Sequence, residues 1–130
     1  MALYVTDTHA LAWYLGKRPE LSSAAQTVFH GAATGANQIV VPTIVIAELL
    51  RMIEKRRTAL KISQVVAALE QAHGYQFAPL TIPSVLQIQA TTSLPDLHDR
   101  FIVATALTFG ATLITQDQTI TQSGLIPVIW

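Results

Sequence analysis

The chain contains only four aspartates, and each lies at the end of an apolar run or at the start of a helix-like segment. Asp7 ends the first such run, in LYVTDT, and Asp117 ends a later one, in LITQD. Asp96 and Asp99 open the helical segment that leads to the later run. Glu48 lies about two turns into another predicted helix and points off its apolar stripe. In a parallel sheet Asp7 and Asp117 emerge from the same edge, where Glu48 is free to join them.

Such a group of acids implies a particular chemistry. Two carboxylates ~6 Å apart repel each other by roughly 3 kcal/mol at an effective dielectric constant of ~20. Several such pairs require a bound cation or raised pKa values. The chain has no cysteine and no closely spaced pair of histidines, which argues against zinc. Oxygen ligands of high charge suit Mg²⁺ or Mn²⁺, and we expect one of these ions.

A structural role competes with the chemical one, because aspartate is also a preferred residue at helix N-caps. Asp96 can cap a helix that begins at Leu97, so we place it outside the catalytic set as a secondary candidate. Asp99 is then the third helical residue, near the positive end of the helix dipole. Thr115 could hydrogen-bond an acid or a phosphate, although a threonine in a strand is more often structural. Arg100 is a candidate to pair with an acid or a phosphate.

The elements that position these residues follow from hydrophobic patterning. Apolar runs without alternation suit strands buried on both faces, and they occupy residues 3–5, 39–41, 75–77, 113–114 and 128–130. Between them, apolar residues recur at helical spacing, with Gly74 and Gly110 placed as helix C-caps. There are no repeats or linkers. We predict one α/β domain over residues 1–130, a three-layer α/β/α sandwich with a central, mainly parallel sheet.

Composition narrows the class of protein. Charged residues make up 12% of the 130 residues and apolar residues 51%, so some apolar surface is expected to face another chain. The net charge is zero and the pI is about 6.9, so any contact with nucleic acid must be local. The absence of cysteine suits a reducing compartment. The first residues do not resemble a signal peptide, no apolar run is long enough to cross a bilayer, and we expect a cytoplasmic protein without a membrane anchor.

Basic residues gather in one part of the chain, where five of the eight occur. Arg51 and Lys55 fall on the helical face that carries Glu48, which makes them a candidate phosphate-binding track. The alternative is a solvated helix end whose charges complement the helix dipole. The five basic residues are Arg51, Lys55, Arg56, Arg57 and Lys61.

Other functional classes lack support in the sequence. Trp13 and Tyr14 are interpreted as core or dimer contacts and are given no role in binding RNA. The four histidines have no ligand spacing, and His98 is expected to form a local hydrogen bond and not to act as a general base. The sequence has no GxSxG motif, no phosphate-binding glycine loop and no dinucleotide fingerprint. Serine hydrolases and nucleotide-binding proteins are therefore excluded.

Four ordered motifs carry a family resemblance: VTDTHALAWYL at residues 5–15, IAEL at 46–49, HDRFIVATAL at 98–107 and LITQD at 113–117. Together they resemble a PIN domain, specifically a VapC-like toxin of a type II toxin–antitoxin pair. The resemblance implies that Asp7, Glu48, Asp99 and Asp117 are the catalytic acids. It also implies a PIN-like fold, a homodimer, a divalent metal, and a cognate antitoxin whose tail reaches the acidic pocket.

The function expected from this resemblance is metal-dependent hydrolysis of RNA phosphodiester bonds, in which the metal activates water and offsets phosphate charge. We expect Asp7 and Asp99 to be the principal ligands, with Glu48 and Asp117 contributing directly or through water. One alternative is a phosphoacceptor signalling domain of flavodoxin-like fold, but no aspartate lies between Asp7 and Asp96 and the last lysine is Lys61. Another is an inactive PIN-like binding module, which has no chemical need for four acids. The RNA target cannot be read from the residues.

Overall fold

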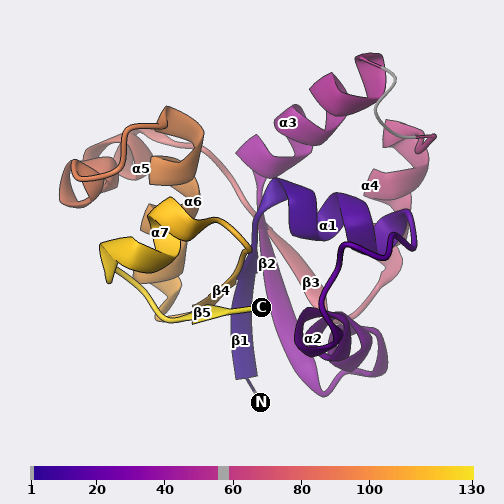
Figure 1. Ribbon diagram of the computed structural model, residues 1–130. Helices are drawn as coiled ribbons and strands as arrows, with labels where there is room; N and C mark the ends of the chain where they lie inside the picture. The colour runs from indigo at the N-terminus through magenta and orange to yellow at the C-terminus, as the bar shows by residue number, and fades with distance from the viewer. Residues whose placement is uncertain (1, 56–58) are drawn as a thin grey trace.

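A parallel sheet forms the centre of the computed structural model, which describes residues 2–55 and 59–130 (Figure 1). In the described part of the chain the sheet has five strands, in the order β3-β2-β1-β4-β5, and every neighbouring pair is parallel. The five strands that the apolar runs predict are confirmed. Their bounds are β1 Ala2–Thr6, β2 Asn37–Pro42, β3 Tyr75–Ala78, β4 Thr112–Ile114 and β5 Val128–Ile129.

Helices cover both faces of the sheet, which confirms the predicted α/β/α sandwich. In Figure 1, α1 to α4 lie to one side of the sheet and α5, α6 and α7 to the other. None of the helices in the described residues is long and apolar enough to cross a membrane. The helices are α1 Thr8–Leu15, α2 Ser23–Thr34, α3 Thr43–Glu54, α4 Ile62–Gln71, α5 Ile82–Gln87, α6 Leu97–Phe109 and α7 Gln118–Ser123, with a 3₁₀ turn, η1, at Ile88–Thr91.

The continuous apolar runs are explained by burial on both faces. Ile39, Val40 and Val41 are consecutive in β2, and all three have no exposed surface. Alternate residues of a strand point to opposite faces, so consecutive buried residues require cover on each side. Val5 pairs with Val40 on one side and with Leu113 on the other, which places the core of the molecule around the middle of β1.

The two glycines predicted as helix C-caps have different roles. Gly110 ends α6 in the left-handed conformation, with φ 59°, as expected. The prediction for Gly74 is wrong, because α4 ends at Gln71 and its C-cap is Ala72. Gly74 lies in the turn that enters β3, where an added Cβ would be 2.0 Å from the carbonyl oxygen of Ala32. A glycine is needed there for the close approach of two backbone segments.

The order of the strands creates a switch point beside β1. The chain runs from β1 outward to β2 and β3, and then returns to the other side of β1 to form β4 and β5. In open parallel sheets, ligands bind outside the carboxyl ends of the strands at such a reversal. Asp7 follows β1 and Asp117 follows β4, so both emerge at this edge, as the sequence predicts.

Candidate active site

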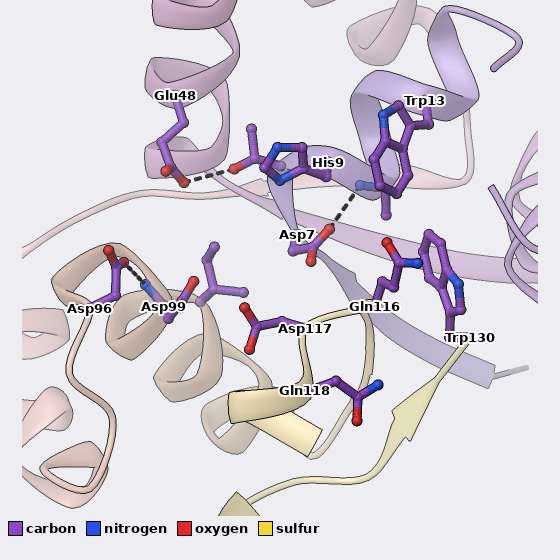
Figure 2. Close-up of a pocket in the computed structure, with 13 residues that line it drawn as sticks. Asp7, His9, Trp13, Glu48, Asp96, Asp99, Gln116, Asp117, Gln118 and Trp130 are labelled. Atoms are coloured by element: carbon purple, nitrogen blue, oxygen red, sulfur yellow. Dashed lines mark hydrogen bonds between the residues drawn. The ribbon is translucent and has the colours of Figure 1, made fainter. Parts of the chain in front are cut away.

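All four predicted catalytic acids line one pocket of about 560 Å³ at the carboxyl edge of the sheet (Figure 2). Asp7 comes from the junction of β1 and α1, Glu48 from α3, Asp99 from α6, and Asp117 from the junction of β4 and α7. Asp96 lines the same pocket. Four separate segments of the chain therefore bring carboxylates to one place.

Asp7 is held through both of its carboxylate oxygens. The backbone N–H of Ala10 donates to Oδ1 at 2.9 Å, which makes Asp7 the N-cap of α1. The hydroxyl of Thr115 donates to Oδ2 at 2.5 Å and accepts a hydrogen bond from the N–H of Asp117 at 3.0 Å. The prediction that Thr115 hydrogen-bonds an acid is confirmed. Its hydroxyl links the ends of β1 and β4.

The environment of Asp7 resists ionisation. Burial is the largest influence and raises the pKa of Asp7 above its usual range. The hydroxyl of Thr115, the N–H of Ala10 and the nearby His9 act in the opposite direction, whereas the negative charge of Asp117 raises the pKa further. A cation bound beside Asp7 would favour the carboxylate form.

Asp96 and Asp99 share the start of α6 but have different surroundings. Oδ1 of Asp96 accepts from the N–H of Asp99 at 2.9 Å, so the predicted cap is confirmed. Within the described residues, no hydrogen bond or ion pair engages the Asp99 carboxylate. The pKa of Asp99 is raised to about 7, first by burial and then by the negative charges of Asp96, Asp117, Glu48 and Asp7, in that order. Among the described residues, Asp99 is therefore the acid of the pocket whose carboxylate has no hydrogen-bond donor.

Glu48 is positioned by two side chains from other helices. The hydroxyl of Thr8 donates to Oε1 at 2.7 Å, and Nδ1 of His98 lies 3.3 Å from Oε2. His98 thus pairs with an acid on a distant helix and not with a local group, so the expected local hydrogen bond is wrong. The sequence interpretation overlooked Thr8, although its place directly after Asp7 on the first turn of α1 was a usable signal. Thr8 is 5% exposed, so its hydroxyl has little access to water as an alternative partner.

Asp117 completes the acidic set on the opposite wall from Glu48. Its Oδ1 accepts from the N–H of Ile120 at 2.8 Å, so Asp117 is the N-cap of α7. Both flanking residues, Gln116 and Gln118, line the pocket with exposed amide side chains. The sequence interpretation passed over both glutamines, because an isolated glutamine carries no distinctive motif.

Among the described residues Arg100 pairs with no acid, so the expectation of an acidic partner is wrong. Its Nη2 donates to the carbonyl oxygen of Ile88 at 2.9 Å, and its Nε donates to Oγ1 of Thr91 at 3.4 Å. Adjacent residues on a helix point about 100° apart, so Arg100 faces η1 while Asp99 faces the pocket. Arg100 fastens η1 to α6 and does not line the pocket.

Trp13 and Tyr14, which are neighbours on α1, have different surroundings. Tyr14 stacks on Phe29 with ring centroids 4.5 Å apart, which confirms the expected core contact. Trp13 is not part of the core, so the core interpretation is wrong for this residue. It is only partly buried, and it lines the acidic pocket together with Trp130.

The basic residues of α3 lie next to the acids. Arg51 and Lys55 line a second pocket of about 290 Å³, and Thr8, His9 and Glu48 belong to both pockets. Arg56 and Arg57 lie outside the described residues. Lys61 directly precedes α4 and is exposed, and it lines neither of these two pockets.

The donor set fits a hard divalent cation that retains water. Every acid in the pocket offers carboxylate oxygens, and the chain contains no cysteine. Within residues 2–55 and 59–130, no three acidic or histidine side chains form a ready-made group of ligands. Mg²⁺ is commonly held by one or two carboxylates, with water and substrate phosphates as the other ligands. The open pocket and the unpaired Asp99 carboxylate suit that mode of binding.

Fold and site together define an α/β/α protein with an acidic pocket at the switch point of its sheet. The sequence model of the PIN domain matches residues 4–123, so the chain belongs to the PIN-domain family. PIN domains generally use divalent metal ions. A search of curated protein sequences finds no match.

Solved structures from three bacteria have the same fold. VapBC2 from Rickettsia felis, bound to a promoter DNA fragment, has a TM-score of 0.67 at 17% identity, covering 98% of this chain and 97% of that one. FitAcB from Neisseria gonorrhoeae has a TM-score of 0.70 at 19% identity, and the match covers 98% of this chain and 96% of that one. A toxin–antitoxin complex from Klebsiella pneumoniae has a TM-score of 0.70 at 19% identity, and the match covers 100% of this chain and 97% of that one. The predicted VapC-like PIN fold is confirmed, and the strand order excludes the flavodoxin-like order 2-1-3-4-5.

Proposed function

We propose that the chain is a metal-dependent endoribonuclease and the toxin of a toxin–antitoxin pair. The observation that carries the proposal is the convergence of Asp7, Glu48, Asp99 and Asp117 from four segments on one pocket. Three of these acids have further reasons to be where they are, as helix caps or hydrogen-bond acceptors. Within the described residues Asp99 is neither a helix cap nor a hydrogen-bond acceptor, and this favours a site whose carboxylates bind a cation.

Each acid and its supporting residue then has a defined task. Asp7 and Asp99 would hold Mg²⁺ or Mn²⁺, while Glu48 and Asp117 contribute directly or through water. Such a cation, when bound, supplies an acidic water and offsets the charge on the phosphate. Thr115 orients Asp7 and stabilises its ionised form by donating a hydrogen bond.

Glu48 is restrained by a hydrogen bond from Thr8 at Oε1 and by the ring of His98 beside Oε2. A carboxylate fixed at both oxygens keeps one orientation, which lowers the entropy cost of positioning it during the reaction. We therefore treat Thr8 and His98 as positioning residues.

The RNA backbone is proposed to follow α3. Arg51 and Lys55 line the pocket that adjoins the acids through Glu48, so they can neutralise phosphates next to the cleaved bond. This local track is compatible with a net charge of zero over the whole chain.

Partners are proposed from the similar structures. The Klebsiella pneumoniae structure is a toxin–antitoxin complex, and VapBC2 is bound to a fragment of promoter DNA. For this chain we propose a cognate antitoxin whose tail reaches the acidic pocket. We also propose a homodimer acting in the cytoplasm.

Cleavage of a mixed RNA pool tests the central proposal. The purified chain should yield products with Mg²⁺ or Mn²⁺ and none with EDTA. Asp99→Asn should abolish cleavage, whereas Glu54→Gln, an exposed acid on α3, should leave it unchanged. An inactive PIN-like binding module would give no products under any of these conditions.

A further inference from the structure

An aromatic wall, formed by His9, Trp13 and Trp130, lies beside the acids. Figure 2 shows it on the side of the pocket away from Asp96 and Asp99. The ring centroids of Trp13 and Trp130 are 5.8 Å apart, with an interplanar angle of 61°. The ring of His9 lies 5.5 Å from that of Trp13.

The rings of this wall are available to a ligand. His9 and Trp13 are four residues apart on α1, so they share one face of the helix. His9 is exposed, and both tryptophans are only partly buried. Two rings that meet edge to face leave the faces of one ring free for a third flat group. Unpaired RNA bases are commonly bound by stacking on such faces.

Polar groups suited to the edge of a base lie in the same pocket. Gln116 and Gln118 flank Asp117 and are exposed. An amide side chain offers both a donor and an acceptor, which matches the mixed pattern on the edge of a nucleobase. A pocket of about 560 Å³ is within the usual range of sites for small organic groups.

We propose that the aromatic wall binds one unpaired base of single-stranded RNA, next to the phosphate on which the acids act. The inference rests on the proposed function and extends it to recognition of the base. It follows from continuity: the pocket of Arg51 and Lys55 shares Glu48 and His9 with the acidic pocket, so the basic residues, the acids and the wall form one connected surface. A strand that crosses the acids would place its phosphates against Arg51 and Lys55 and one base against Trp13 and Trp130.

Tryptophan fluorescence gives a direct test, because both tryptophans of the chain belong to the wall. The Asp99→Asn variant in EDTA is titrated with a short single-stranded RNA and with the same strand carrying abasic sites. The intact strand should quench the fluorescence in a saturable manner, and the abasic strand should bind at least about 5-fold more weakly. Equal binding of both strands without quenching would overturn the proposal.

Cleavage kinetics provide a second test in the active protein. Trp13→Leu should raise KM for RNA by roughly 5- to 150-fold, equivalent to ~1–3 kcal/mol of missing stacking energy. Trp13→Phe should stay within a few-fold of the parent, and Phe109→Leu, an exposed aromatic at the end of α6, should have no effect. If thermal unfolding shows that Trp13→Leu is unfolded, Trp130→Leu takes its place with the same expected rise in KM. An unchanged KM in a folded variant would overturn the proposal that the aromatic wall binds a base.

The outcomes separate this inference from the proposed function. If the parent chain does not cleave RNA with Mn²⁺, the proposed function fails, and the fluorescence titration still decides whether the wall binds bases. If the parent chain cleaves RNA, but neither removing the bases changes RNA binding nor Trp13→Leu changes KM, only the proposal of base binding by the aromatic wall is refuted. Quenching by N-acetylarginine amide, with none by RNA, would assign the wall to a cationic side chain of a protein partner and overturn the proposal.

Discussion

At the scale of single residues, Asp99 differs from the other aspartates of the pocket. Asp7, Asp96 and Asp117 each accept a backbone hydrogen bond as the N-cap of a helix. Asp99 accepts none among the described residues, and burial together with the neighbouring acids raises its pKa to about 7. Its charge is therefore the least compensated in the metal-free protein.

Replacing Asp99 by Asn should stabilise the metal-free protein at neutral pH while abolishing cleavage. The folded-state pKa of about 7 lies above the ordinary 3.8, so Asp99 binds its proton more tightly in the folded than in the unfolded chain. Its contribution to stability is then greatest below pH ~4 and declines as pH rises towards 7. For a half-exposed carboxyl screened by water, Asp99→Asn should add about 1–2 kcal/mol at pH 7.5.

Thermal unfolding in EDTA between pH 4 and 8 measures this difference. The gain from Asp99→Asn should be small near pH 4 and grow with pH. Adding Mn²⁺ should raise the Tm of the parent and have less effect on the variant, because a ligand that binds only the folded state stabilises it. A destabilised variant that still cleaves RNA would show that Asp99 serves the helix start and would refute its catalytic assignment.

Thr115 acts through Asp7, so removing its hydroxyl should change the pH dependence of cleavage. The Thr115 hydroxyl lowers the pKa of Asp7, and Thr115→Val removes that hydrogen bond. The acidic limb of the pH–rate profile should move to higher pH, by about one unit for a hydrogen bond to a charged acceptor. Thr115→Ser keeps a hydroxyl and should leave the limb near its original position. A profile that falls uniformly without shifting would indicate a purely structural threonine.

At the scale of elements, the start of α6 combines a structural acid with a proposed catalytic one. Asp96 caps the helix and Asp99 occupies its first turn, two functions that are three residues apart. The strand-to-helix junctions at Asp7 and Asp117 are built in the same way. Helix capping and the assembly of the pocket therefore use the same short segments.

Two substitutions at Asp96 should distinguish capping from catalysis. Asp96→Ala removes the cap and should cost about 1 kcal/mol of stability, whereas Asp96→Asn retains an acceptor and should cost less. Both remove a negative charge that raises the pKa of Asp99, so activity should persist and its acidic limb should move to lower pH. Denaturant unfolding and cleavage rates across pH measure the two effects. If Asp96→Asn abolishes cleavage as Asp99→Asn does, Asp96 belongs to the catalytic set.

At the scale of the whole molecule, one buried core lies between the sheet and its helices, and it supports the proposal of a single PIN-like domain over residues 1–130. Large apolar side chains nevertheless remain exposed near α5, where Leu80, Ile82 and Leu86 have 49%, 74% and 59% of their surface exposed. Apolar exposure of this kind commonly marks a contact with another chain.

The isolated chain should therefore sediment as a dimer at micromolar concentration. If the surface near α5 forms the contact, Ile82→Lys should shift the population towards monomer, because a buried unpaired charge opposes association. Glu70→Lys, a charge change on the exposed surface of α4, serves as the control. A parent chain that sediments as a stable monomer contradicts the homodimer proposal.

The basic side of the site should control the salt dependence of RNA binding. Replacing Arg51 and Lys55 by Gln should weaken binding and flatten the plot of log K against log salt, by about 0.7 for each phosphate of a single strand that is no longer neutralised. Lys17→Gln with Lys61→Gln removes the same charge away from this pocket and should leave the slope unchanged. An unchanged slope after replacement of Arg51 and Lys55 would make them ordinary charges of a solvated helix.

Much of this arrangement is determined by local sequence. Apolar runs without alternation specify strands buried on both faces, and in a parallel sheet those strands bring Asp7 and Asp117 to the same edge. The cap at Asp96 and the end of α6 at Gly110 follow from neighbouring residues alone. Such features are predictable because their physical causes act within a few residues of the chain.

Contacts between distant segments were decided only by the tertiary structure. Thr8 donates a hydrogen bond to Glu48, which is 40 residues away in the sequence, and the ring of Trp13 contacts that of Trp130. The orientation of α6 about its own axis points Arg100 towards η1 and away from the acids. These pairings depend on how helices pack on the sheet and on the strand order, which periodicity does not encode. Local patterns thus determined which acids reach the edge of the sheet, and packing decided which side chains surround them.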